Sequence, residues 1–319
     1  MLRPKELKAE LDKYILNHEE SKKIICTTMY NHYLRINSNK NLPKDNLLMI
    51  GKSGTGKTYM IDCLSKILNF FYVVQDCTRF TAEGCYGDDI DSALRALYIK
   101  IQKSDWELTR EEIVELIESS VIVLDEIDKK VIGSNYHNGL GAQQVMLKFL
   151  EGSDCTFNTE NDNRYSATAD LMTINTKNIL FIGAGVFDGI TKPSKSMGFG
   201  SKTENIREID PEHVVKFGFL PEFVGRFTNI TVLDDLTVDD LLNILTKSKE
   251  NILTKYEDLL AESDVKIKLS NKTLQEIAEK AFKLKNGVRG LNTILNKYLL
   301  NIMYELPKGG KCYETSIMG

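Results

Sequence analysis

The chain has 319 residues, 42% of them apolar and 27% charged, which is typical of an ordinary soluble globular protein with room for two domains. A net charge of −4 excludes a general nucleic-acid binder, because such a protein needs a basic face to release counterions from phosphates. No apolar run approaches the ~20 residues of a membrane span. The amino-terminal segment is charged and amphipathic, unlike a secretory signal. The six cysteines form no CxxC pair and no metal spacing with the four histidines, so we expect free thiols, a cytoplasmic location and no zinc module.

A glycine-rich motif follows the first predicted strand, at 47–50. The sequence GKSGTGKT at 51–58 matches the pattern GxxxxGK[ST] and precedes an apolar-periodic helix. Glycines at this spacing let backbone N–H groups curl around a β-phosphate at the start of a helix. Lys57 is predicted to reach the β- and γ-phosphate oxygens and Thr58 to offer its hydroxyl to Mg²⁺. The predicted nucleotide-binding residues of this loop are Gly51, Ser53, Gly54, Thr55, Gly56, Lys57 and Thr58.

A second motif, SSVIVLDEIDKK, occupies 119–130. Its unbroken apolar run predicts an inner parallel strand that is covered on both faces. The run ends in Asp125 and Glu126, at the strand end where open α/β sheets place their ligands. We expect Asp125 to hold Mg²⁺ and Glu126 to orient and polarise the attacking water. The phosphate loop and the acidic pair together predict a nucleotide triphosphatase.

The chain changes character after about residue 236. Helical spacing dominates there, with a short alternating strand at 265–269 and a following helix capped by Ser270 or Asn271. We therefore expect an α/β nucleotide-binding domain over 1–235, with a parallel sheet flanked by helices, and a smaller, mainly helical α+β lid over 236–319. A hinge near 233–238 would open and close with the state of the nucleotide.

Several segments resemble the AAA+ unfoldase ClpX, the ATPase partner of the ClpP peptidase. The resemblance runs nearly end to end, from the helices at 7–35 to the segment at 285–307, and it includes LDEID, GAQQVMLKFLEG (141–152), NILFIGAGVFDGI (178–190) and KFGFLPEFVGRF (216–227). It implies an AAA+ fold, ATP with Mg²⁺, a homo-hexameric ring, unfolded or tagged protein substrates and a ClpP-type peptidase as partner.

The resemblance also implies roles for four residues outside the two motifs. Ile15 and Leu16 would flank the adenine, although a helix-start core pair is the alternative interpretation. Arg226 resembles an arginine finger, which a neighbouring subunit supplies, and Arg289 resembles the sensor arginine of the small domain. A guanidinium forks onto phosphate oxygens and always carries its charge. For each arginine the alternative is an ordinary salt bridge.

The family grips its substrate with a Gly-aromatic-apolar-Gly pore loop. The corresponding residues here are Gly84, Cys85, Tyr86 and Gly87, so the aromatic ring is shifted by one position. We expect Tyr86 to grip the translocating chain, because a bulky ring provides contact area without regard to sequence. The alternatives are a packing tyrosine and a weak or specialised grip.

The segment KPSKSMGFGSKTEN at 192–205 shows neither helical nor strand periodicity, yet it holds two large apolar side chains. By resemblance, Met197, Gly198 and Phe199 form the aliphatic-Gly-aromatic tripeptide that docks in a hydrophobic cleft of the peptidase. Several such loops on one ring add their weak contacts through effective concentration. The alternative is that these are incidental exposed hydrophobes.

Four features depart from the family pattern. We expect the protein to lack the four-cysteine zinc module that precedes the ATPase in the family. The segment 153–177 stands in place of a basic pore-entrance loop although it has one Arg and no Lys before Lys177. Residues 182–187 offer only small apolar side chains where a polar sensor is usual, and we expect the tail after Pro307 to omit the last strand of the small domain.

Three hypotheses follow. The first is an ATP-driven ring unfoldase that feeds a separate peptidase, since the chain shows no Ser/His/Asp peptidase constellation. The second is a peptidase-independent remodeller of a particular complex. The third is a nucleotide-gated scaffold that no longer translocates. A P-loop kinase is disfavoured, because the Asp-Glu pair and the arginine finger serve hydrolysis.

Overall fold

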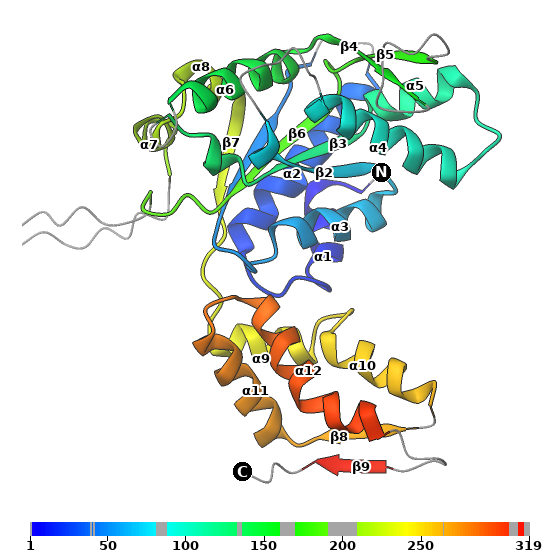
Figure 1. Ribbon diagram of the computed structural model, residues 1–319, viewed down its shortest axis with the longest axis vertical. Coiled ribbons are helices and arrows are strands. Elements are labelled where there is room, and N and C mark those ends of the chain that lie inside the picture. Colours follow the sequence, from blue (N-terminus) through cyan, green and yellow to red (C-terminus); the bar gives the residue numbers. More distant parts are fainter. Residues whose placement is uncertain are drawn as a thin grey trace, which may run out of the picture.

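The computed structural model describes residues 2–38, 40, 42–80, 88–132, 136–159, 170–190, 209–263, 265–305 and 312–315. Figure 1 shows a larger α/β body that contains the amino-terminal helices and the main sheet, followed by a smaller, mainly helical body. The chain passes between them once, after strand β7.

The main sheet has five parallel strands. In spatial order they are β2 (Tyr72–Asp76), β3 (Val121–Asp125), β6 (Leu180–Gly185), β1 (Asn46–Ile50) and β7 (Phe227–Val232). All residues of β1 and β6 are buried, which explains why both strands are apolar apart from Asn46 at the start of β1. Because the strands run parallel, their carboxyl ends meet at one edge of the sheet, and β1, β6 and β3 are neighbours there.

Helices cover both faces of this sheet. The helices of the larger body are α1 (Pro4–Leu11), α2 (Glu19–Ile36), α3 (Lys57–Leu68), α4 (Asp88–Ser104), α5 (Arg110–Glu118), α6 (Tyr136–Glu151), α7 (Pro211–Phe217) and α8 (Pro221–Val224). Alternate strand residues face opposite layers: Leu47 and Met49 of β1 pack in one hydrophobic core with α1, α2 and α3, while Leu48 and Ile50 pack in the other with α4, α5 and α6. The larger body is thus a three-layer α/β sandwich, as predicted.

Short elements complete the larger body. An antiparallel pair, β4 (Asp154–Asn158) and β5 (Leu171–Asn175), contacts the α4–α5 side of the fold. Two 3₁₀ turns follow strands of the main sheet, η1 (Cys77–Arg79) after β2 and η2 (Ile127–Lys130) after β3. The second turn begins directly after Glu126, the last residue of the acidic pair.

The smaller body has its own hydrophobic core. Its elements are α9 (Val238–Thr246), α10 (Ile252–Ala261), β8 (Lys266–Leu269), α11 (Asn271–Lys283), α12 (Val288–Glu305) and β9 (Cys312–Thr315). The side chain of Ser270 caps α11 by accepting a hydrogen bond from the Thr273 N–H, as one of the two predicted caps. The expectation that the tail lacks a final strand is wrong: β9 pairs in parallel with β8, because backbone pairing recruits a segment that carries no strong strand pattern.

Candidate nucleotide site at the carboxyl edge of the sheet

The glycine-rich loop lies between the carboxyl end of β1 and the start of α3. Gly54 and Gly56 have φ values of +79° and +99°, a left-handed backbone that other residues rarely adopt. Gly56 is the N-cap of α3 and no side chain caps this helix. The amide groups of its first turn therefore remain available to an anion.

Lys57 opens α3 and reaches back across the loop. Its ammonium group donates hydrogen bonds to the carbonyl oxygens of Gly51, at 2.5 Å, and Lys52, at 3.0 Å. Burial lowers the pKa of Lys57, while the nearby carboxylates of Asp125 and Asp128 oppose that shift. A phosphate group would supply a stronger, charged partner than these two carbonyls.

The acidic motif faces the loop from the end of β3. Asp125 accepts a hydrogen bond from the backbone N–H of Glu126 at 2.9 Å. Glu126 has a φ of +54°, which is unusual for a residue with a side chain and is found where the surroundings enforce it. Asp128 supplies part of that constraint, because its buried carboxylate accepts a hydrogen bond from the Val186 N–H at 3.2 Å, at the end of β6.

Gly185 is required at this contact. A Cβ on Gly185 would lie 2.6 Å from the Asp128 carboxylate oxygen, so a side chain there would push η2 away from β6. Within 182–187, where the sequence lacks a polar sensor, Gly185 thus makes room for Asp128. The polar group at the end of β6 comes from the acidic motif rather than from β6 itself.

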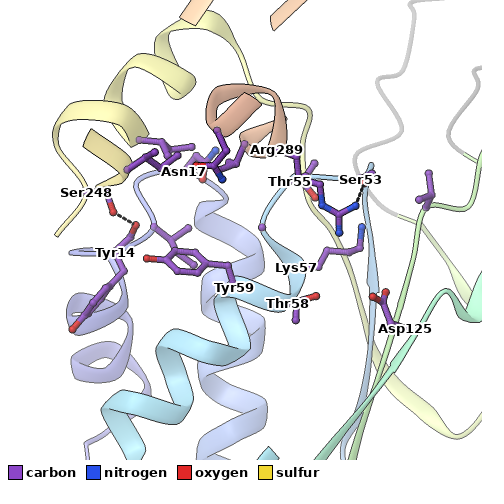
Figure 2. A pocket seen from close by; sticks show the side chains of 18 of the residues that line it. Tyr14, Asn17, Ser53, Thr55, Lys57, Thr58, Tyr59, Asp125, Ser248 and Arg289 are labelled. Atoms are coloured by element: carbon purple, nitrogen blue, oxygen red, sulfur yellow. Dashed lines mark hydrogen bonds between the residues drawn. The ribbon is translucent and has the colours of Figure 1, made fainter. Parts of the chain in front are cut away.

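The lid covers the loop. Val288 N–H donates to the Gly54 carbonyl at 3.0 Å, and the Arg289 guanidinium donates to the Ser53 hydroxyl at 3.0 Å (Figure 2). Gly287 packs so closely that a Cβ on it would overlap the Gly54 carbonyl oxygen. The start of α12 therefore rests on the phosphate loop, and Arg289 points into the same cavity as Lys57.

The two residues expected at the adenine are placed differently. Ile15 is buried and lines the cavity, whereas Leu16 is 37% exposed and is not among the lining residues. They differ because they are adjacent in an irregular connection between α1 and α2, where neighbouring side chains point in different directions. Of the predicted pair, the structure brings Ile15 to the site.

These elements enclose one cavity of about 560 Å³, within the usual range of small-molecule sites. Figure 2 shows Lys57, Thr58 and Asp125 at one end, and Tyr14, Asn17 and Ser248 at the other. The sequence-predicted residues that line it are Ile15, Ser53, Gly54, Thr55, Gly56, Lys57, Thr58, Asp125, Glu126 and Arg289. Gly51 lies behind the loop, where a Cβ on it would come 3.0 Å from the Leu233 side chain.

Sequence reasoning missed several lining residues. Tyr59 directly follows the glycine-rich motif and Asp128 comes two residues after Glu126, so their positions were a usable signal. Tyr14 and Asn17 flank the predicted adenine pair. Ser248 belongs to the lid, and nothing in its local sequence marks it.

Arg226 is not part of this cavity. It lies immediately before β7, where the Asn46 side chain at the first position of β1 donates to its carbonyl at 3.0 Å. That is the amino-terminal edge of the sheet, opposite the phosphate loop. Its guanidinium forms an ion pair with Glu151 at the end of α6, and both side chains are about half exposed.

The predicted pore-loop residues Gly84, Cys85, Tyr86 and Gly87 lie outside the described residues, as do the docking residues Met197, Gly198 and Phe199. Cys26, Cys63, Cys77 and Cys155 are buried thiols, and within the described ranges no group of three or more His, Cys, Asp or Glu is arranged to hold a metal ion. No helix in the described part of the chain combines the length and apolar character needed to cross a membrane.

A glycine-rich loop that opens a helix at a partly buried lysine, faced by the acidic end of another parallel strand of the same sheet, defines a P-loop nucleotide triphosphatase. The chain belongs to the AAA domain family (Cdc48 subfamily), whose model matches residues 42–230. Residues 236–317 match the C-terminal D2-small domain of the ClpB protein. The two matches identify an AAA+ ATPase of the Clp/HSP100 type, which confirms the predicted fold class and the predicted ATPase. Such ATPases use a nucleotide with Mg²⁺, and they typically form hexameric rings that act on proteins.

Proposed function

We propose that the protein is a ClpX-like unfoldase and translocase, which hydrolyses ATP in a homo-hexameric ring and delivers unfolded chains to a ClpP-type peptidase. The family assignment supports the ATPase and its action on proteins. The end-to-end resemblance of the sequence to ClpX supports the finer function.

The proposal of a ring rests on the position of Arg226. β1 has five residues, which at ~3.3 Å each separate Arg226 at its amino end from the phosphate loop at its carboxyl end by roughly 16 Å, across a packed sheet. Arg226 therefore cannot complete its own site. It can complete the site of a neighbour, and a head-to-tail contact of this kind closes into a ring when the rotation allows.

The residues of the cavity divide the chemistry among them. Lys57 and the loop amides hold the phosphates, Arg289 senses the γ-phosphate from the lid, and Glu126 orients the attacking water. Thr58 and Asp125 would hold Mg²⁺, which neutralises charge on the phosphates when bound. The oxygen ligands of these two side chains suit that ion.

We further propose that the chain divides into the domains 1–235 and 236–319. A separate hydrophobic core that begins at Leu236 supports this division, while Leu233 still packs with β1. The contact of α12 with the phosphate loop supports a lid that moves with the nucleotide. Rotation of six such lids would pull a substrate through the ring.

The grip of Tyr86 and the docking of Met197, Gly198 and Phe199 stay predictions from the sequence, as does the cytoplasmic location. Their test uses the purified protein, ATP, a ClpP-type peptidase and a folded fluorescent substrate with a degradation tag. Loss of fluorescence together with peptide release supports the proposal, and the Glu126→Gln variant should bind ATP and do neither. Unfolding without peptide release would favour the peptidase-independent remodeller. ATP turnover without unfolding would favour the scaffold, and no ATP turnover would contradict all three.

A further inference from the structure

The connection between α1 and α2, residues 13–18, touches three parts of the molecule at once. Tyr14, Ile15 and Asn17 line the cavity from this connection. Its backbone also contacts the lid, and its last residue, His18, contacts the phosphate loop. We name it the 13–18 segment.

His18 ties the segment to the phosphate loop. Its Nε2 lies 3.0 Å from the carbonyl oxygen of Thr55, which sits between the two left-handed glycines Gly54 and Gly56. A carbonyl can only accept, so Nε2 carries the proton and His18 donates. Both residues are buried, at 6% and 5% exposure, so water cannot replace this donor if it is lost.

The opposite end of the segment is tied to the lid. The Ser248 hydroxyl, just after α9, donates to the Tyr14 carbonyl at 2.7 Å (Figure 2). The next residue, Lys249, donates its backbone N–H to the Lys13 carbonyl at 2.8 Å and its ammonium to the Tyr14 hydroxyl at 2.9 Å. Two of these three bonds use backbone atoms of the segment, so they fix its path rather than one side chain.

An ion-pair network makes the segment stiff between these ends. The ammonium of Lys22, 1% exposed, donates to the Ile15 carbonyl at 2.9 Å and pairs with Asp12 at 2.5 Å and Glu19 at 2.7 Å. The two carboxylates flank the segment on both sides. A displacement of its lid end is therefore passed on to His18 rather than absorbed by bending.

We propose that the 13–18 segment is a second mechanical link between lid and phosphate loop, separate from Arg289, and that His18 is the positioning residue at its phosphate end. The proposal rests on the nucleotide site described above and deepens it. When the lid closes, Ser248 and Lys249 hold the segment, and His18 holds the Thr55 carbonyl outward. The amides of the loop then face the phosphates. Burial lowers the pKa of His18 and keeps its ring neutral, which suits a single donor to a carbonyl.

The test measures the affinity of Mg·ADP by calorimetry for the wild type, His18→Leu, His18→Gln, Ser248→Ala and the double variant His18→Leu/Ser248→Ala. Loss of one hydrogen bond predicts a 2- to 12-fold weaker affinity for His18→Leu. His18→Gln retains an N–H donor, so its affinity for Mg·ADP should stay within about 2-fold of that of the wild type. If His18 acted only by packing, the retained donor would not restore the affinity. Ser248→Ala should weaken binding several-fold, and the double variant should be no weaker than about the worse single variant, because both changes cut one link.

Unchanged affinity of folded His18→Leu, or fold-changes that multiply in the double variant, would overturn the proposal. If His18→Leu does not fold, Ser248→Ala decides alone, and wild-type affinity there would overturn it. Failure of the wild type to bind ADP would instead refute the nucleotide site itself.

Discussion

The contact between Gly287 and the phosphate loop can be broken with a single methyl group. Gly287 precedes α12 with a φ of +54°, and a Cβ there would overlap the Gly54 carbonyl oxygen. The nearest atoms on Gly54 are all backbone, so no side chain can move aside. In Gly287→Ala the start of α12 must therefore lift off the loop.

The size of the effect follows from the bonds that this movement breaks. Lifting α12 removes the Val288 to Gly54 bond and the Arg289 to Ser53 bond, each 3.0 Å long. At about 1 kcal/mol each they sum to about 2 kcal/mol, which predicts a roughly 30-fold weaker affinity for Mg·ADP. Calorimetry measures this affinity, and Gly189→Ala serves as the matched control. Gly189 also has a left-handed backbone, at φ +93°, but its Cβ would meet no atom within 4 Å. A folded Gly287→Ala protein that binds within about 3-fold of the wild type would refute this reasoning.

Three further predictions concern other regions. His32 is buried against the Ser119 carbonyl, and burial lowers its pKa from 6.5 to about 4. Between these pH values the imidazole is protonated in the unfolded chain but neutral in the folded protein, so the free energy of unfolding should fall by up to about 3 kcal/mol as the pH drops from 6.5 to 4. Denaturant unfolding measured at several pH values in this range should show that the free energy of unfolding depends less steeply on pH in His32→Gln than in the wild type. An identical pH dependence would disprove the assignment. Tyr86→Ala should abolish unfolding of a folded fluorescent substrate while ATP turnover persists; unchanged unfolding speaks against the grip. Phe199→Asp should lose co-elution with a ClpP-type peptidase but keep its ATPase, and retained co-elution would remove the docking role.

The elements built from local pattern were predictable from the sequence. The apolar run before Gly51 and the run that ends in Asp125 gave two inner strands, and the loop motif needs no distant residue to be recognised. The cap at Ser270 depends on residues three positions apart. In each of these cases the deciding interactions lie within a few residues along the chain.

Contacts between distant residues were not predictable in the same way. The bond from His18 to Thr55 and the bond from Ser248 to Tyr14 join segments that only the tertiary fold brings together. Asp128 looked like one more charge after the acidic pair, and its role in fixing η2 depends on the space beside Gly185. The strand β9 was missed because its partner β8 supplies the pairing that its own sequence does not announce.

The central claim, that Arg226 completes a neighbour's site, is tested most directly by mixing two inactive variants. Glu126→Gln lacks the residue that orients water, and Arg226→Ala lacks the arginine, so each ring alone should hydrolyse almost no ATP. In random mixed rings about one interface in four joins an intact Glu126 to an intact Arg226 of the neighbour, and ATPase activity should return to about a quarter of the wild-type value. A mixture that stays inactive although mixed rings form, or an Arg226→Ala protein with full activity, would contradict the account.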